Sequence, residues 1–498
     1  MRWALLIAVS LCIIVNSHFN AEASDLFDPS VIQVEGTRNE HLSEPASKNK
    51  LLYIFCFLFC RYVEWSYHEP EEGQYLFEGD RDVAKFIRTA AEEGLYVLLR
   101  VGPYICAERD LVNYIAESGK WLDKFFEQTS SLLYGKGGPI ILVQVENEYG
   151  SYGNNMNYRV QVRNMLKSHV GTNALLYTTD GNAGSFFRNG AVPETLTTID
   201  FGPRSNVQQS FNELRQFMPT GPLMNSEYYT GWLTHWGERL AVTKAEDVAK
   251  TLGDIISYGA NVNFYMFFGG TNFEYTAGKL HLLFNYIKHH LWANFFGTFQ
   301  PDITSYDYDS PITEAGDLTP KYHLIREKLK EHNFVNDSIE IPQNSPKGNY
   351  GPVNVTATMN LLSPEGRSQL GKKYPDVTGP KLPTFEGLRQ RAGLMLYETT
   401  LTEADDLLHI KSPRDMIFVF VDGGYIWVNG HNLGRYWPTA GPQITLYLPG
   451  VWLKPAPEKN HLRILELNRP PPVLSMDFID YPILNRTGNI NWWRDYLD

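Results

Sequence analysis

Cysteine is scarce in this sequence, and its placement does not suggest a metal site. The chain has 4 Cys among 498 residues. Cys12 lies in the N-terminal apolar run, which leaves Cys56, Cys60 and Cys106, so at least one thiol is free or pairs between chains. Cys56 and Cys60 lie in a hydrophobic run with no His pair nearby, which is not the spacing of a zinc site. We predict no metal site and no cofactor.

Positive charge is also in short supply. The chain has 44 Lys and Arg against 56 Asp and Glu, which gives a net charge of −12 at pH 7. Nucleic acids and anionic membrane surfaces are bound through clustered Lys and Arg, so we expect neither as a partner. After the N-terminus no apolar run is long enough for a membrane span, because Leu51–Cys60 falls short of the roughly 18 residues required.

The N-terminus predicts the secretory pathway. Arg2 precedes an apolar run over Trp3–Val15, and small residues with A-x-A spacing follow at Ala21 and Ala23. This order is typical of a signal peptide, which we expect over residues 1–23. Three sequons are candidate glycosylation sites on that route: Asn336, Asn354 and Asn485. We expect the protein in the lysosome or outside the cell.

Apolar strands alternate with amphipathic helices up to about residue 330. The strand-like runs are Gly94–Tyr104, Pro139–Val145, Ala174–Tyr177, Leu196–Phe201, Gly221–Asn225 and Ala260–Phe268. Helical periodicity separates most of them, as over Tyr158–His169 and Ala245–Tyr258. Apolar strands that alternate with helices favour a parallel sheet covered on both faces, and this many units predict a (β/α)8 TIM barrel over residues 24–330.

Carboxylates follow three of these strands, at the rim where a barrel places its active site. They are Glu108, Glu146, Glu148 and Glu227. Aromatic residues follow Glu148 and Glu227 directly. Two carboxyl groups in an aromatic pocket suit glycoside hydrolysis, in which one carboxyl must keep its proton and the other must stay ionised.

Several long blocks of the sequence carry a resemblance to a known family. They are RVGPYICAE at 100–108, VQVENEYGSYG at 143–153, NSEYYTGW at 225–232, FFGGTNF at 267–273 and TSYDYDSPITEAGD at 304–317, with a further block at 424–467. In these blocks the chain resembles the β-galactosidases of glycoside hydrolase family 35, which include the animal lysosomal acid β-galactosidase. The resemblance implies an exo-acting, retaining hydrolase that removes terminal non-reducing β-D-galactose from glycoconjugates by double displacement. Its two carboxyl groups would lie about 5–5.5 Å apart.

The resemblance also implies roles for single residues. Glu148 matches the acid/base of the family, Glu227 its nucleophile, and Asn147 the residue that holds the 2-hydroxyl of the sugar. The other positions that match substrate-binding residues are Tyr62, Ala107, Glu108, Tyr229, Trp232, Tyr265, Tyr306 and Tyr308. We expect Glu146 to support the site, because the period of a strand would place it on the same face as Glu148. We expect Arg100 to pair with a buried carboxylate.

The sequence departs from the family at four places. Residues 24–60 do not resemble the first strand and helix of the family's barrel, so only seven good barrel strands are found, and Val31–Val34 is a poor eighth. A segment that the family has after the position of Asp110 is missing here. Residues Lys279–Thr298 have no counterpart in the family, which has a short loop at this place. At the junction 423–424, most of two β-rich domains of the family are absent. Because the flanking blocks are intact, we hypothesise a mis-spliced or mis-predicted transcript, which sequencing the mature message would test.

The C-terminal third is typical of β structure. Residues 340–390 are rich in Pro, Gly and Ser, so we expect a linker that wraps the barrel over 331–395. Over 396–498 we expect a truncated β-sandwich or jelly-roll module that resembles a galactose-binding domain. Expected strands are Phe418–Val421, Tyr425–Val428, Gln443–Leu448 and Leu462–Leu467.

Two alternatives to a β-galactosidase stay open. If the missing strand prevents the barrel from closing, the chain is a catalytically inactive secreted sugar-binding or misfolded product of the same family. The same mechanism on another sugar, such as a β-glucosaminide, is the second. The expected partner is a β-galactoside glycan, with water as the second substrate. A homodimer is among the expected oligomeric states.

Overall fold

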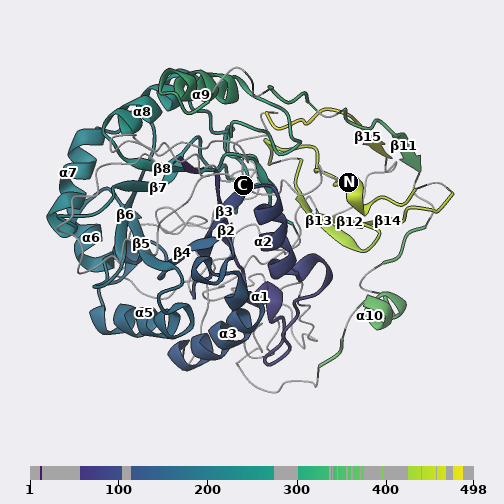
Figure 1. Ribbon diagram of the computed structural model, residues 1–498. Helices are drawn as coiled ribbons and strands as arrows, with labels where there is room; N and C mark the ends of the chain where they lie inside the picture. The colour runs from purple at the N-terminus through teal and green to yellow at the C-terminus, as the bar shows by residue number, and fades with distance from the viewer. Residues whose placement is uncertain are drawn as a thin grey trace, which may run out of the picture.

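The computed structural model describes residues 12–13, 57–103, 114–273 and 301–335, most of 338–374, residues 388 and 395, and 424–485 apart from 439, 456 and 467–474. A ring of strands surrounded by helices forms the larger part, and short strands from the C-terminal third lie beside it (Figure 1). The predicted strands Val31–Val34 and Phe418–Val421 and the segment Lys279–Thr298 lie outside the described residues.

Parallel strands β2 to β8 form the barrel wall in chain order. They are β2 (Phe57–Tyr62), β3 (Leu95–Arg100), β4 (Ile140–Gln144), β5 (Leu175–Gly181), β6 (Leu196–Phe201), β7 (Met224–Tyr229) and β8 (Asn261–Tyr265). Every residue of β6 is buried, as expected of a parallel strand that is covered on both faces. The predicted TIM barrel is confirmed, and the apolar run Leu51–Cys60 supplies most of β2.

The first position of the barrel differs from a regular (β/α)8 ring. β1 (Cys12–Ile13) is a two-residue strand that closes the ring by pairing antiparallel with β2 and β8. No parallel strand of the described ranges occupies this place, which agrees with the seven good strands found in the sequence. Cys12–Ile13 also lies within the predicted signal peptide, so cleavage near Ala23 would remove β1 from the mature barrel.

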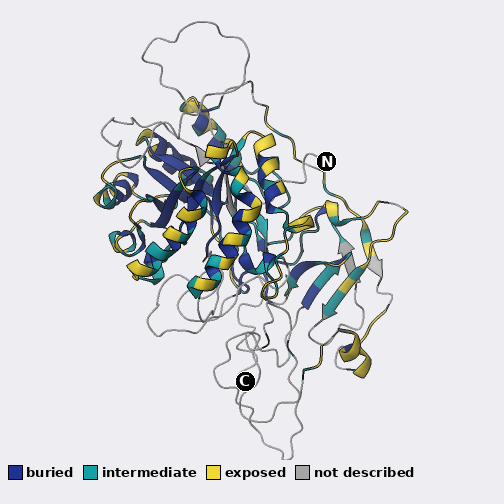
Figure 2. Cartoon of the chain, turned by 60° about the horizontal axis from the view of Figure 1, so that its bottom comes forward, coloured by how far each residue is buried: buried dark blue, intermediate teal, exposed yellow. Residues whose placement is uncertain are grey.

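Helices surround the strands and bury one face each (Figure 2). The longer ones are α2 (Val83–Glu92), α3 (Tyr114–Thr129), α5 (Met156–Val170), α7 (Val207–Phe217), α8 (Ala245–Ser257) and α9 (Pro320–Glu331), with short α1 (Trp65–His68), α4 (Tyr149–Tyr152) and α6 (Gly184–Gly190). Asn155 and Asn206 begin α5 and α7, because their side chains accept hydrogen bonds from the backbone NH groups of Tyr158 and Gln209. None of the helices in the described part is long and apolar enough to cross a membrane.

The C-terminal third forms two small antiparallel sheets. β12 (Gly424–Val428) lies between β13 (His431–Tyr436) and β14 (Leu462–Glu466), and β11 (Gly351–Asn354) pairs with β15 (Ser475–Phe478). β12 and β14 were predicted. The predicted strand Gln443–Leu448 is wrong, because this segment is extended but joins no described sheet, and β13 was missed. β11 lies inside the predicted linker, which also contains α10 (Pro364–Leu370).

The barrel and these sheets are joined by specific contacts. Trp236 packs against Trp437 with ring centroids 6.0 Å apart. The backbone NH of Ser305, in β10 (Ser305–Tyr306), donates to Gln443 Oε1 at 2.9 Å. β10 itself pairs with β9 (Gly270–Thr271), which follows the last barrel strand. The C-terminal sheets therefore contact the loops that follow β7 and β8, near the rim where the candidate site lies.

Candidate active site

The candidate catalytic residues lie where barrel strands end. Arg100 is the last residue of β3, Glu148 follows β4, and Glu227 is in β7. The ladder of β7 shifts by one residue between Asn225 and Tyr228 with respect to both of its neighbours, which is a β-bulge. Neighbouring residues of a regular strand point to opposite faces, whereas the bulge lets Ser226 and Glu227 both contact side chains of the barrel interior.

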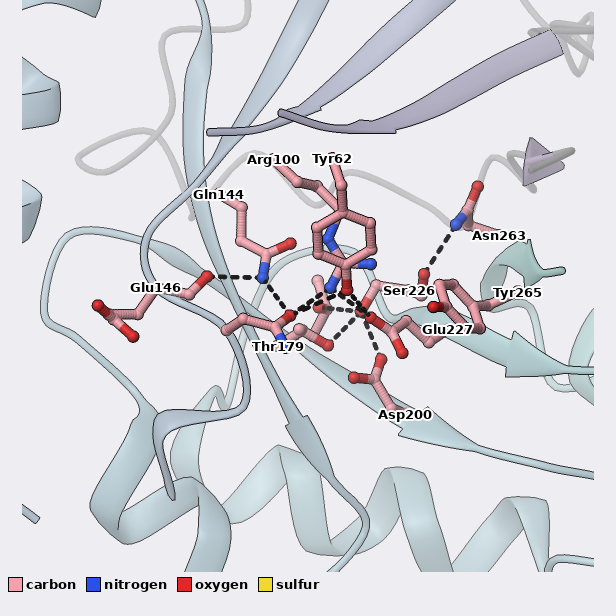
Figure 3. A network of polar contacts seen from close by, with 12 residues as sticks. Tyr62, Arg100, Gln144, Glu146, Thr179, Asp200, Ser226, Glu227, Asn263 and Tyr265 are labelled. Carbon is pink, nitrogen blue, oxygen red and sulfur yellow. Dashed lines mark hydrogen bonds and ion pairs between the residues drawn. The ribbon is translucent and has the colours of Figure 1, made fainter. Parts of the chain in front are cut away.

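Glu227 is buried and paired with a cation. Its Oε1 accepts a hydrogen bond from Tyr62 OH at 2.8 Å and forms an ion pair with Arg100 (Figure 3). The Arg100 guanidinium also lies over the Tyr62 ring, 4.0 Å from its centroid. These are the partners that a charged carboxylate requires inside a protein. The prediction that Arg100 pairs with a buried carboxylate is confirmed.

Asn147 is held in one orientation beside this pair. Its Oδ1 accepts hydrogen bonds from Arg100 and from Gln144 Nε2 at 2.8 Å, and Tyr62 OH lies 3.3 Å away. Tyr177 OH donates to Gln144 Oε1 at 2.9 Å, which fixes the amide of Gln144 in turn. Since the oxygen of Asn147 faces these donors, its NH2 group faces the other way.

Glu148 is the second carboxyl of the site. It has a left-handed backbone conformation with φ of 46° at the start of α4, uncommon for a residue other than glycine. Burial raises the pKa of Glu148 well above its ordinary value, and the charge of Glu227 raises this pKa further. The group therefore keeps its proton to a higher pH than an ordinary glutamate.

Glu146 is directed away from the other two carboxyls. Its carboxylate accepts hydrogen bonds from Tyr152 OH at 2.6 Å and from Tyr158 OH, and it points away from Glu227 in Figure 3. The reason given for its supporting role was wrong, because β4 ends at Gln144 and Glu146 itself has φ of 63°. The supporting role stays a prediction, which these contacts favour.

Aromatic rings form a continuous wall from the carboxyl groups outward. Tyr265 contacts Tyr62, Tyr229 and Tyr308 with centroids 6.3, 6.3 and 5.5 Å apart. Trp232 contacts Tyr229 and Tyr308 at 5.3 and 6.1 Å. Tyr306 lies 5.3 Å from Tyr308, and its hydroxyl is 3.2 Å from that of Tyr265. All six aromatic residues that the sequence predicted for the site are thus brought together, and Trp232, which is 39% exposed, lies at its outer end.

One protein-family model matches the residues of this barrel. The model of glycosyl hydrolases family 35 matches residues 57–332, which include all seven parallel strands. The chain belongs to glycosyl hydrolase family 35. It is therefore a glycoside hydrolase. A second model, the galactose-binding domain of β-galactosidase, matches residues 408–460.

Curated relatives in family 35 cover most of the chain. A β-galactosidase from Felis catus is 32% identical over 86% of this chain and 85% of its own length, and a β-galactosidase-1-like protein from Mus musculus is 32% identical over 88% and 86%. The Homo sapiens β-galactosidase is 40% identical over 73% of this chain and 54% of its own length. The cat alignment is 594 residues long, longer than the 498 residues here, so the cat protein has segments that this chain lacks.

The remaining predicted residues of this family-35 chain are two substrate contacts and three sequons. Ala107, Glu108 and the sequon Asn336 lie outside the described residues. Asn354 is the last residue of β11, and Asn485 is exposed. In the described part of the chain, no group of three or more His, Cys, Asp or Glu side chains is placed to hold a metal ion.

Sequence reasoning missed the polar residues beneath the family-35 site. Thr179 of β5, Thr198 and Asp200 of β6, and Ser226 of β7 are all buried and lie in contact below Glu227. One signal was available, because Asp200 is an acidic residue inside the otherwise uncharged strand run Leu196–Phe201. The position of Ser226 could not be foreseen, because it depends on the bulge in β7.

Proposed function

We propose that this chain is an exo-acting, retaining β-galactosidase that hydrolyses terminal β-D-galactose through a covalent glycosyl-enzyme intermediate. The observation that carries this proposal is the contrast between its two carboxyl groups. Glu227 has a cation and a phenol as partners, whereas burial raises the pKa of Glu148. A retaining glycosidase requires this contrast, with an ionised nucleophile beside an acid that keeps its proton.

The two carboxyls divide the work. Glu227 attacks the anomeric carbon while Glu148 gives its proton to the departing glycosidic oxygen, so the leaving group departs as an alcohol. Glu148 then removes a proton from water, which attacks the same carbon and releases the sugar with its configuration retained. The Asn147 NH2 group donates to the 2-hydroxyl, a contact that strengthens in the transition state.

The aromatic wall and its polar edges supply the substrate site. Tyr229, Trp232, Tyr265, Tyr306 and Tyr308 present ring faces to a sugar, and the wall is closed at its inner end by Tyr62. A single sugar held against this wall beside Glu148 and Glu227 fits exo-acting cleavage. The choice of galactose rests on the names of the relatives, and Ala107 and Glu108 stay proposed contacts to its hydroxyls.

The proposal is tested with a chromogenic β-galactoside. We expect hydrolysis by the wild-type protein with β-galactose as the first product, seen by proton NMR before mutarotation. Glu148→Gln should lower kcat by about 10²–10⁴-fold and Glu227→Gln by at least as much. Glu146→Gln is the matched control, since it removes a neighbouring carboxylate that points away from Glu227. Its kcat should fall far less. Wild-type protein that is folded and binds galactose but does not hydrolyse the substrate would overturn the proposal.

A further inference from the structure

Four side chains form a buried polar cluster directly beneath Glu227. The cluster consists of Thr179, Thr198, Asp200 and Ser226, each no more than 2% exposed. Ser226 Oγ lies at its centre, 2.5 Å from Thr179 Oγ1, 2.5 Å from Thr198 Oγ1 and 2.8 Å from Asp200 Oδ1. Figure 3 shows Asp200 and Tyr62 on opposite sides of the Glu227 carboxylate.

The cluster has more contacts than its hydroxyl groups have hydrogens. Thr198 Oγ1 donates its hydrogen to the backbone oxygen of Thr178 at 2.8 Å, so its contact with Ser226 must use the hydrogen of Ser226. The single hydrogen of Thr179 serves either its contact with Ser226 or its hydrogen bond to Asp200, which lowers the pKa of that carboxyl. No hydroxyl hydrogen then remains for the contact between Ser226 and Asp200. These contacts outnumber the three hydroxyl hydrogens, so the hydrogen between Ser226 and Asp200 must come from Asp200.

The surroundings of Asp200 also disfavour a negative charge. The titratable groups that face it are Glu227 on β7, Tyr229 at the end of β7, Glu148 after β4, Asp180 on β5 and Arg100 on β3. Only Arg100 is a cation, and it is already paired with Glu227. In the described part of the chain, Asp200 Oδ2 has no hydrogen-bond donor. Burial, with the charge of Glu227 as the second cause, raises the pKa of Asp200 to about 8.

We propose that Asp200 is a positioning residue that acts as a neutral carboxylic acid, whose proton is donated to Ser226 and fixes the bulge that carries Glu227. In this arrangement Ser226 accepts from Thr179 and Asp200 and donates to Thr198, which satisfies its full hydrogen-bonding capacity. The neutral state also leaves Glu227 as the nearest negative charge to the acid/base. Its effect on catalysis rests on the proposed function, whereas its protonation state does not.

The protonation state is measured directly on substrate-free protein with 13C-labelled Asp side chains. The Asp200 carboxyl signal is assigned as the one missing from the Asp200→Asn spectrum. We expect this signal to be that of a protonated acid at about pH 5–6 and to titrate near pH 8. A signal that is already ionised at about pH 5–6 would overturn the proposal, whatever the outcome of the hydrolysis assay.

Removing one hydroxyl tests the hydrogen count itself. In Thr198→Val the hydrogen of Ser226 is released from its contact with Thr198, so Ser226 can donate to an ionised Asp200. The titration midpoint of Asp200 should therefore fall by about one pH unit or more. Thr197→Val, a buried threonine of the same strand that makes none of these contacts, should leave the midpoint in place. Equal midpoints in both variants would contradict the count, and the wild-type titration stands if either variant fails to fold.

A rescue experiment tests the positioning role. The amide of Asp200→Asn can donate to Ser226 as the neutral acid does, whereas Asp200→Ala cannot. We expect kcat of Asp200→Asn to exceed that of Asp200→Ala by at least about tenfold. In the wild type, activity should decrease near pH 8 as Asp200 ionises, and this decrease should be absent in Asp200→Asn. Equal losses in the two variants would mean that the negative charge of Asp200 is what the site needs, which overturns the proposal.

Discussion

Tyr62 connects the nucleophile with the aromatic wall. Its hydroxyl donates to Glu227 at 2.8 Å, its ring lies under the Arg100 guanidinium, and its edge contacts Tyr265. The ring and the hydroxyl therefore have separate tasks. The ring shapes the pocket and shields the ion pair, and the hydroxyl satisfies one lone pair of a buried carboxylate.

Tyr62→Phe separates these tasks, because it keeps the ring and removes the hydroxyl. A hydrogen bond to a charged group contributes about 1.5–3 kcal/mol, so we expect kcat to fall about 10- to 100-fold in a folded protein. Steady-state kinetics would measure this. Tyr258→Phe is the control, since the Tyr258 hydroxyl donates to Asn212 on the surface, and its kcat should match the wild type. A Tyr62→Phe enzyme within about threefold of the wild type would contradict the assigned contact.

At the scale of residues, the sequence predicted most of the side chains that the structure brings together at the candidate site. Glu148, Glu227, Asn147 and most of the aromatic residues lie in the last residues of barrel strands or just after them, and parallel strands bring such ends together. The contacts of Glu146 and the cluster around Asp200 were not predicted. They depend on left-handed backbone conformations after β4 and on one extra residue in β7, and neither leaves a periodic pattern in the sequence.

At the scale of elements, apolar runs predicted the strands that are buried on both faces, and they predicted only part of the C-terminal sheets. β3 to β8 overlap with predicted runs, β7 only at Met224 and Asn225, but β13 (HNLGRY) has few apolar residues and was missed. The alternating segment Gln443–Leu448 looked like a strand, yet its described backbone contact with another segment is the single hydrogen bond from Ile444 to Ile483. Alternation predicts an extended chain, and only a neighbour with free backbone groups makes it a ladder.

Gly434 in β13 allows the C-terminal sheet to approach the barrel. It has φ of 102°, and an added Cβ would lie 2.5 Å from Thr304 Cγ2 and 2.9 Å from the backbone oxygen of Asn272. Gly430 has a similar φ of 92° with nothing within 4 Å of its Cβ position. A side chain at either glycine would therefore strain the backbone, but only a side chain at Gly434 would also collide with the barrel.

Gly434→Ala should therefore destabilise the protein more than Gly430→Ala does. Both substitutions carry about 1–3 kcal/mol of backbone strain, and Gly434→Ala adds about 1–3 kcal/mol from overpacking against Thr304 and Asn272. Urea unfolding of both variants and the wild type would measure the difference in unfolding free energy. Equal losses would show that the close approach of β13 to the barrel contributes nothing to stability.

At the scale of the whole molecule, buried carboxyl groups set the response to pH. Burial raises the pKa of Asp200 and of Glu314 to about 8 and that of Asp302 to about 7. It also raises the pKa values of Glu148 and Asp180. In the unfolded chain such groups ionise near pH 4. Between about pH 4 and pH 8 the native state therefore binds more protons than the unfolded state.

Stability should accordingly fall as the pH rises through this window, because a state that binds more protons is favoured at low pH. Each group that is protonated only in the native state lowers the unfolding free energy by up to about 1.4 kcal/mol per pH unit. Urea unfolding at about pH 5 and pH 8 would show the decrease. In Glu314→Gln, whose amide keeps the contacts with Ser305 and Thr271, the decrease should be smaller by the contribution of one group. The control is Glu331→Gln on the surface, which should leave the decrease in unfolding free energy unchanged. An unfolding free energy that rises from pH 5 to pH 8 would mean that these carboxyls are ionised in the native protein.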